Sequence, residues 1–288
     1  MKTSSFFFFF FLLLTISSPL YAVQPGNSVT SLPLWELKVA LTAARLPHYT
    51  GSDEYKNYFF PLPYLVYRGE FFQADRDSVR TIVYKTNRLE TDISMWGNPP
   101  VPEDNRARAG MEKLDALLEI GPALRYYFHR DGISDGLFLK GAIRSVFSAG
   151  WDSGPDLRYQ GLHSDIHLIF KNNSIFAAQQ LQFHISAGLH FADAEFNEYF
   201  YEVGEKDSIP GRDMYSTGGG YSGFSLAASI IKQLTPTISF GWYGRWDNIN
   251  GASYENSPLV KEKNNYTIGA MLIFTLAQSE KPLSPSSR

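Results

Sequence analysis

The sequence predicts an all-β protein, a transmembrane antiparallel up-and-down β-barrel of about twelve strands. Three observations lead to this fold class: a long stretch of alternating apolar and polar residues, the return of that pattern downstream, and an N-terminal segment typical of exported proteins. In the clearest stretch, 114–128, Leu118 and Leu124 fall on one face while Glu119 and Arg125 fall on the other. Fifteen residues suit a tilted strand that crosses an outer membrane. Strands of soluble sheets usually have about five or six residues.

The N-terminal segment has the layout of a secretory signal peptide. Lys2 supplies a positive charge, 6–16 is dominated by Phe and Leu, and a small residue, Ala22, ends the segment. Eleven apolar-rich residues are too few to cross a bilayer as a helix. We therefore expect cleavage after Ala22, with an uncleaved anchor as the alternative. The chain is then divided into a signal peptide at 1–22, an outer-membrane barrel at 23–276 and a polar, flexible C-terminal tail at 277–288.

The composition limits the chemistry that the chain can perform. There is no cysteine, which excludes thiol catalysis, disulfides and cysteine-bound metal. A formal net charge of −3 does not favour nucleic acid as a partner. Aromatic residues make up 15% of the chain, which suits the aromatic girdles of an outer-membrane barrel.

Candidate strands follow one another along the chain, separated by turn-forming residues. We expect them at 34–44, 59–67, 70–76, 79–86, 88–96, 114–128, 136–149, 158–171, 176–191, 219–232, 236–248 and 264–276. The segments 70–76 and 79–86 are the weakest, and only two residues join them. A barrel of ten membrane strands is therefore the alternative.

The connections between these strands alternate in length. If the chain enters from the periplasm, the turns on the periplasmic side are 68–69, 86–87, 129–135, 172–175 and 234–236. The connections on the outer side are 45–58, 77–78, 97–113, 150–157, 192–218 and 249–263, of which only 77–78 is short. Short periplasmic turns and long outer loops are typical of outer-membrane barrels.

The presumed inner face of the barrel carries charges of both signs. The candidate lumen residues are Glu119, Arg125, Lys140, Arg144, His163, Asp165, His167 and His184, with further polar groups at Glu90, Asp92, Arg245 and Asp247. Because opposite charges can pair across strands, we expect a lumen crosslinked and partly plugged by ion pairs. A water-filled pore with mild selectivity is the alternative.

A two-residue turn at Asn173-Ser174 would place His163 opposite His184 and Asp165 opposite Gln182. The same register would place His167 opposite Gln180. Two imidazoles and a carboxylate could bind zinc, but spacing alone does not define a metal site. We expect a hydrogen-bonded polar ladder, and we assign no metal and no cofactor.

Catalytic signals are weak. Ser186 shares a face with His184, which leaves an outer-membrane hydrolase as one alternative. The sequence has no G-x-S-x-G elbow and no phosphate-binding G-x-x-x-x-G-K-[ST] loop. We therefore expect no catalytic residue and no enzymatic activity.

Four segments together resemble the MipA/OmpV family of outer-membrane proteins (MltA-interacting protein). They are 46–72, which contains LPHYTGSD, PLPY and YRG; the tyrosine-rich 198–203; the glycine-rich hairpin 218–246; and NSPLV at 256–260. The positions that carry the family motif are Pro47, Tyr49, Gly51, Ser52, Asp53, Pro61, Pro63, Tyr64, Arg68, Gly69, Ser257 and Pro258.

The resemblance implies a protein of the outer membrane of a Gram-negative bacterium. It implies a non-enzymatic scaffold that links a murein lytic transglycosylase with a peptidoglycan synthase. Outer-membrane lipid is the other expected partner. A porin-like channel for small solutes is the alternative function. The family has no agreed catalytic residues, and the tail after Phe274 departs from its pattern.

The prolines of the first motif also have a physical interpretation. Pro61 and Pro63 lack amide donors and would disturb the centre of a sheet. We expect them at a bulge or at the barrel rim, or in a segment that folds inward as a small plug, in each case with a structural role.

Overall fold

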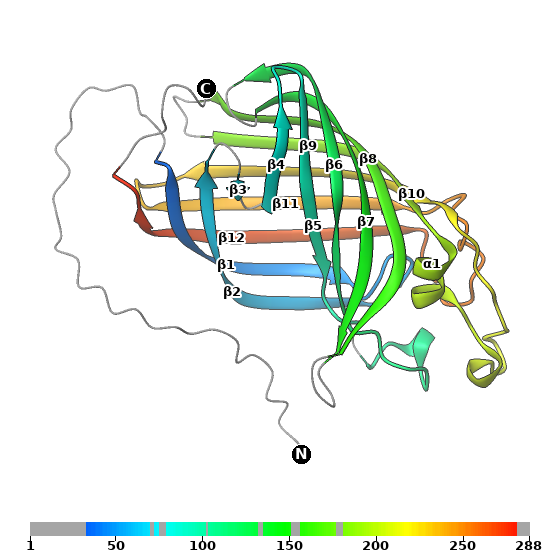
Figure 1. Cartoon of the computed structure of the whole chain (residues 1–288). Coiled ribbons are helices and arrows are strands. Elements are labelled where there is room, and N and C mark those ends of the chain that lie inside the picture. The colour runs from blue at the N-terminus through cyan, green and yellow to red at the C-terminus, as the bar shows by residue number, and fades with distance from the viewer. Residues whose placement is uncertain are drawn as a thin grey trace. The chain divides into compact units, whose positions relative to one another are not determined.

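The computed structural model of the protein describes residues 33–69, 72–74, 79–101, 103–131, 135–150, 156–176 and 181–280. Within these residues, twelve antiparallel strands form one sheet that closes on itself as an up-and-down barrel, with β1 paired to β12 (Figure 1). Each strand is hydrogen-bonded to its neighbours in chain order. The predicted fold class is therefore confirmed.

The strands occupy the following ranges: β1 Trp35–Pro47, β2 Tyr55–Arg68, β3 Phe72–Ala74, β4 Val79–Lys85, β5 Leu89–Asn98, β6 Ala116–Asp131, β7 Asp135–Gly150, β8 Asp156–Phe176, β9 Leu181–Ala192, β10 Gly220–Gln233, β11 Ile238–Asn248 and β12 Asn264–Gln278. One α-helix, α1 at Ala194–Tyr201, and two 3-10 turns, at Arg106–Arg108 and Glu205–Asp207, lie in the described connections.

Each expected strand has a counterpart in the structure. The ten-strand alternative is wrong, because β3 pairs with both β2 and β4 and completes the barrel. The strand β8 is longer than expected and continues to Phe176, so its connection to β9 falls at 177–180, outside the described residues. The strand β12 continues to Gln278, so the first two residues of the predicted tail pair with β1.

Side chains alternate between the two faces of the wall, as the sequence pattern predicts. In β6, Leu118, Leu124 and Phe128 are exposed, while Glu119 and Arg125 are buried. In a membrane barrel the outward face meets lipid acyl chains, so apolar side chains there are in contact with an apolar solvent. Burial of the charged face inside the barrel is what makes its ion pairs necessary.

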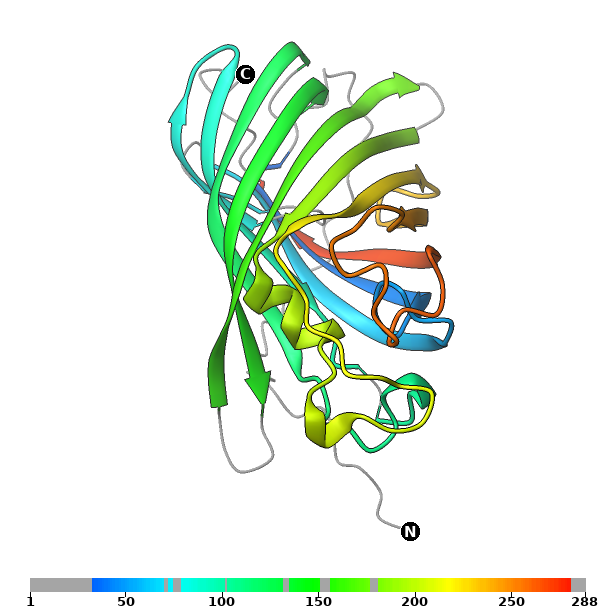
Figure 2. The ribbon, with the colours of Figure 1, turned by 90° about the vertical axis from the view of Figure 1, so that its right-hand side faces the viewer.

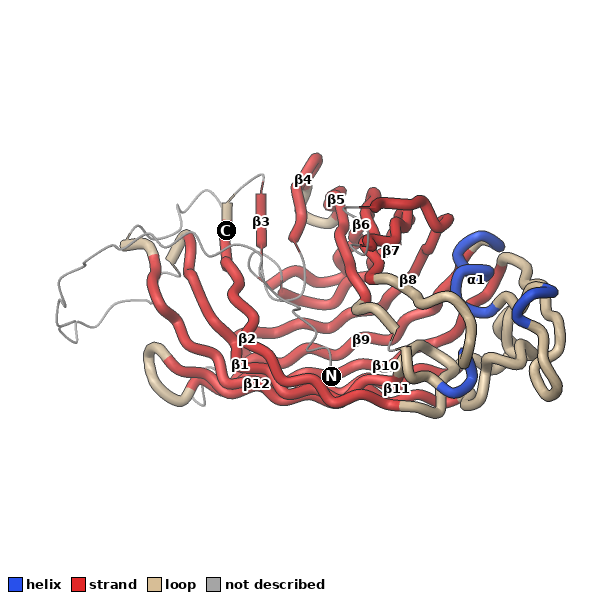
Figure 3. Tube along the Cα trace, turned by 90° about the horizontal axis from the view of Figure 1, so that it is seen from below, coloured by secondary structure: helices blue, strands red, loops and turns tan. Residues whose placement is uncertain are grey.

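The long described connections lie at one end of the barrel, which we call the long-loop end. They comprise 48–54, 99–115, 193–219 and 249–263, and α1 belongs to the third of them. Figure 2 faces this end, and Figure 3 shows the helices and long loops gathered there. The opposite end, which we call the short-turn end, carries the described turns at 86–88 and 234–237 and both ends of the described chain.

The wall is not paired evenly around its circumference. The strand β2 pairs with β1 over thirteen residues, including Pro61 with Leu41 and Pro63 with Val39, without a register shift. The expectation of a bulge or plug at these prolines is therefore wrong. On its other side, β2 pairs with β3 at only two described positions. Because proline has no amide donor, it fits in a strand only at positions where the ladder does not need that donor.

Candidate functional site

A network of buried ion pairs runs along the inner wall of the barrel from β5 to β8. The guanidinium of Arg144 on β7 donates to Glu119 of β6 at 3.0 Å and also contacts Asp165 of β8. All three side chains are almost fully buried. Because each carboxylate is paired with the same cation, the three neighbouring strands are held together through their inner faces.

Further pairs extend this network along the same wall. Arg125 donates to Asp92 at 2.8 Å, and Arg130 donates to Glu90 at 3.2 Å. The ammonium of Lys140 lies 3.4 Å from the hydroxyl of Ser94. The structure therefore places the predicted lumen residues of β6, β7 and β8 on one inner surface, with the carboxylates of β5 as additional partners.

Histidines connect this network to the long-loop end. The Nδ1 of His163 lies 2.8 Å from Glu119 Oε2, and because a carboxylate only accepts, that nitrogen carries the proton. The ring of His163 stacks on Phe196 of α1 at 5.2 Å between centroids and on His190 at 5.7 Å. His167 meets His190 edge to face at 5.2 Å. Phe196 thus links the long loop that contains α1 to the lumen.

The predicted register between β8 and β9 is wrong. His163 lies opposite Ala192, Asp165 opposite His190, and His184 opposite Lys171. The pairing is displaced by eight residues because β8 runs beyond the Asn173-Ser174 turn expected from the sequence. An even displacement keeps every side chain on its face, so the histidines still share the inner surface.

The displaced register separates the residues proposed as a zinc site. His184 no longer faces His163, and Gln180 lies outside the described residues. In the part of the chain that the structure describes, no group of three or more His, Cys, Asp or Glu side chains could hold a metal ion. Among the same residues, no helix combines the length and apolar character needed to cross a bilayer.

Among the described residues, no base is hydrogen-bonded to the serine considered as a nucleophile. Ser186 of β9 is buried and lies opposite Ile169 of β8 and Ala227 of β10. Its hydroxyl makes no hydrogen bond to any described residue. A serine nucleophile requires a base within hydrogen-bond reach.

The residues of the family motif divide between three places. Pro61, Pro63 and Tyr64 lie in the wall on β2, whereas Arg68 and Gly69 lie at the short-turn end. Arg68 donates there to Glu36 at 2.5 Å. The other motif positions, Pro47, Tyr49, Gly51, Ser52, Asp53, Ser257 and Pro258, lie at the long-loop end.

At the long-loop end, apolar residues from separate loops form one packed cluster, which we call the loop cap. It comprises Tyr49, Val101, Leu114, Tyr201, Ile249, Ala252 and Tyr254, against which Tyr199, Phe200 and Val260 pack. The rings of Tyr201 and Tyr254 stack 3.7 Å apart, and Tyr49 meets Tyr201 edge to face. Aromatic packing of this kind gives the loops a core of their own.

Tyrosine and serine hydroxyls tie the motif segments together inside the loop cap. Tyr49 donates to the Leu259 carbonyl at 2.6 Å, Tyr201 to the Thr50 carbonyl at 2.7 Å, and Ser257 to the Tyr201 carbonyl at 2.7 Å. Burial raises the pKa of Tyr49 and the pKa of Tyr201. Both hydroxyls therefore remain protonated donors at neutral pH.

A glycine of the motif fills a position that other residues rarely adopt. Gly51 has φ of +100°, and its amide donates to Asn265 Oδ1 at 2.6 Å. The amide group of Asn265 in turn donates to the Ser52 carbonyl at 2.8 Å. The turn at Gly51 is therefore fixed against the start of β12, and a side chain at this φ would be strained.

Several residues that hold the loop cap were not predicted from the sequence. Asn105 donates to Ser52 and lies 3.0 Å from His48 Nδ1, and Arg108 donates to the Phe200 carbonyl at 2.8 Å. Polar residues in irregular loops have no periodicity that could reveal such roles. The helix α1 was also missed, although Asp193 is a recognisable N-cap whose Oδ1 accepts from the Phe196 amide at 2.9 Å.

Comparison with known proteins places these features in a family. The family model of the MltA-interacting protein MipA matches residues 39–276. The outer membrane protein Omp26La of Vibrio anguillarum is 28% identical over 93 residues, which are 31% of this chain and 34% of that protein. The match thus spans about a third of the length of the curated relative.

Two solved structures also resemble the chain at 10% sequence identity. The CymD monoaromatic hydrocarbon channel matches with a TM-score of 0.36 over 86% of this chain and 90% of its own. Neisserial surface protein A matches with a TM-score of 0.19 over 84% of this chain and 97% of its own. The family match, together with the closed barrel and its apolar outer face, identifies the chain as an outer-membrane β-barrel that belongs to the MipA family.

Proposed function

We propose that the protein is a non-enzymatic scaffold that binds a murein lytic transglycosylase at the short-turn end and brings it together with a peptidoglycan synthase. The observation that carries this proposal is the match to the MltA-interacting family over 39–276. Outer-membrane barrels direct their short turns to the periplasm, where murein is remodelled. The short-turn end is therefore the surface that such enzymes reach.

The geometry of that end supports a defined docking surface. The Leu34 amide donates to Ser279 Oγ at 2.8 Å, and the Ser279 amide donates to the Trp35 carbonyl at 2.9 Å. Arg68 also donates to the Pro33 carbonyl at 2.9 Å. Both ends of the described barrel are thus fixed side by side at the short-turn end.

The lumen favours the scaffold over the porin-like alternative. The pairs formed by Arg144 and Arg125 lie on the inner wall, and the loop cap is packed at the long-loop end. In an open pore we would expect these charged groups to face water, whereas here they pair with one another. In the described part of the chain no base is hydrogen-bonded to Ser186, so no observation favours the hydrolase alternative.

The test is direct binding of a purified lytic transglycosylase of the MltA type to the folded protein in lipid nanodiscs. We expect saturable binding to the full-length protein. Binding should be weaker in a variant that ends at Glu280 and so lacks the end of the tail. Lysozyme, which also acts on murein, serves as the control protein. Transglycosylase that binds the barrel no better than lysozyme does would refute the scaffold role, and unchanged binding after truncation would exclude the tail from the docking surface.

A further inference from the structure

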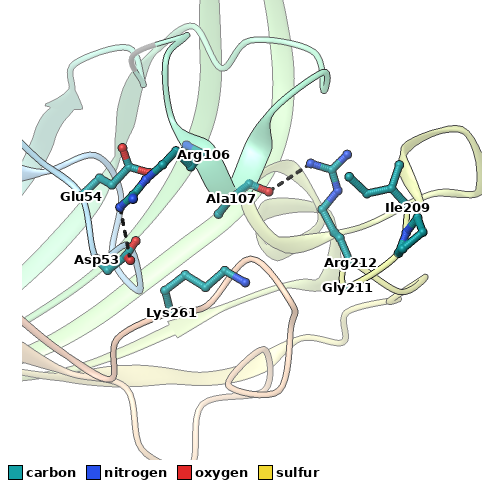
Figure 4. Close-up of a pocket in the computed structure, with 9 residues that line it drawn as sticks. Asp53, Glu54, Arg106, Ala107, Ile209, Gly211, Arg212 and Lys261 are labelled. Carbon is teal, nitrogen blue, oxygen red and sulfur yellow. Dashed lines mark hydrogen bonds and ion pairs between the residues drawn. The ribbon is translucent and has the colours of Figure 1, made fainter.

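A polar pocket opens at the long-loop end, away from the proposed docking surface. It has a volume of about 290 Å³ and is formed by four separate loops, which contribute Asp53 and Glu54, Arg106, Arg212 and Lys261 (Figure 4). The backbone amide of Lys261 donates to the Gly51 carbonyl at 2.7 Å. The pocket is therefore attached to the same glycine turn that anchors the loop cap.

The cations of this pocket are not all neutralised. Arg106 is paired, since its Nε lies 3.2 Å from Glu54 and its Nη2 lies 3.8 Å from Asp53. Arg212 is buried to 6% exposure, yet it donates only to backbone carbonyls, those of Asp207, Ala107 and Ala109, at 2.9, 3.1 and 2.9 Å. The ammonium of Lys261 has no hydrogen-bond or ion-pair partner among the described residues.

Arg212 keeps hydrogen-bond donors that its backbone contacts do not use. Carbonyls satisfy three of its five N–H groups and leave the two of Nη2 without a hydrogen bond in the described chain. Nη2 of Arg212 is not one of the fully buried polar atoms that lack a partner, so its two N–H groups are open to an anion in the pocket. Figure 4 shows Lys261 extending between the Asp53 side and the Arg212 side of the pocket.

We propose that this pocket binds a phosphate monoester carried on a sugar. A guanidinium and an ammonium on the same pocket supply donors and charge for a phosphate. The carboxylates of Asp53 and Glu54 provide acceptors for sugar hydroxyls on the opposite side. The volume is near the lower limit of small-molecule sites, which suits a monosaccharide unit. Phosphorylated sugars of the outer leaflet and soluble sugar phosphates share this chemistry.

The experiment is calorimetric titration of the full-length folded protein with glucose 1-phosphate, using methyl glucoside as the uncharged probe. We expect the phosphate ester to bind and the glucoside to bind much more weakly. Lys261→Gln should weaken binding of the ester about tenfold, the effect of losing one charged hydrogen bond. Lys263→Gln is the matched control, because Lys263 pairs with Glu255 outside the pocket, and it should bind like the wild type.

Further arms identify the source of the ligand and protect against a folding artefact. Titration with nanodiscs that contain phosphorylated or dephosphorylated lipopolysaccharide tests whether the ligand is a membrane sugar or a soluble one. Tighter binding of phosphorylated lipopolysaccharide or of glucose 1-phosphate than of its counterpart without phosphate supports the proposal. Lys261→Glu should abolish binding while heat-modifiable gel migration stays normal. Equal binding of ester and glucoside, wild-type affinity in Lys261→Gln, or no binding of any phosphorylated probe would overturn it. Transglycosylase capture uses the opposite end, so either proposal can fail alone.

Discussion

At the scale of single residues, the barrel depends on charges that must be paired because water does not reach them. Arg144 forms ion pairs with two carboxylates, those of Glu119 and Asp165, which belong to different strands. The sequence predicted that these residues share the inner face, because alternation assigns faces. It could not predict which carboxylate meets which cation, because that depends on register, and the expected pairing of His163 with His184 was wrong for this reason.

Replacement of Arg144 tests how much the lumen depends on this cation. Arg144→Met should lower the free energy of unfolding by about 3 kcal/mol, because two buried carboxylates lose their counter-ion. Urea unfolding in lipid vesicles measures this difference. Arg158→Met is the control, since the Arg158–Asp156 pair is exposed to solvent, and it should leave stability unchanged. Equal effects of the two substitutions would contradict a buried network.

His48 predicts a pH dependence of the loop cap. Its Nδ1 lies 3.0 Å from Asn105 Nδ2, which donates, so the imidazole is neutral at that nitrogen. Burial lowers the pKa of His48 and the nearby Lys56 acts in the same direction, while Glu54, Asp104 and Asp53 oppose it. Because the folded-state pKa of His48 lies below the unfolded value of 6.5, neutral His48 contributes its full stabilisation of the loop cap above pH 6.5. That stabilisation is lost as the pH falls from 6.5 through the folded-state pKa.

Amide hydrogen exchange at pH 7.5 and pH 5.5 measures this effect in residues 48–54, after correction for intrinsic exchange rates. Protection should fall at the lower pH in the wild type. His48→Gln keeps an acceptor for Asn105 but does not titrate, so its protection should be independent of pH in this range. The same loss in the variant would mean that another group is responsible.

At the scale of elements, the strands were predictable and the loops were not. Period-two alternation located each of the twelve strands, because one face meets lipid and the other meets a polar interior. The loops obey no such period. The tyrosines of 198–203 were recognised by resemblance alone, yet the structure places Tyr201 at the centre of the loop cap. The helix that carries it is short and depends on its cap.

Removal of that cap should loosen α1. Asp193 accepts from the Phe196 amide through Oδ1 and from the Leu162 amide through Oδ2, each at 2.9 Å. Asp193→Ala should destabilise the helix by about 1 kcal/mol and increase amide exchange across 194–201. Glu195→Ala changes an exposed residue in the same turn and should cause a smaller increase. Equal exchange in the two variants would show that tertiary packing alone holds the helix.

At the scale of the whole molecule, the ion pairs of the inner wall and the loop cap lead us to expect a barrel closed to solutes. The ion pairs join β5 to β8 within the lumen, and the loop cap unites loops from around the rim. Composition and alternation predicted a membrane barrel, and resemblance predicted its family. Neither predicted the loop cap, since contacts between distant loops leave no local signal in one sequence.

Planar bilayer recording tests this closure. The reconstituted wild-type protein should show no steady conductance in salt solution if the paired charges and the loop cap close the lumen. Arg144→Met should introduce intermittent conductance as the unpaired carboxylates draw in water. Steady wild-type channels whose ion selectivity changes in Arg125→Ala would contradict closure and favour the porin-like function.

The sparse pairing of β2 with β3 has a mechanical consequence. A barrel held together by backbone hydrogen bonds opens most easily between the two neighbouring strands that share the fewest paired residues. The strands β2 and β3 share two described pairs, whereas β7 and β8 share fourteen. Among the described pairs, this is the place where lateral tension in the bilayer would separate two strands most easily. The two prolines of β2 lower the energetic cost of such an opening, because proline has no amide proton that would be left without an acceptor in the lipid.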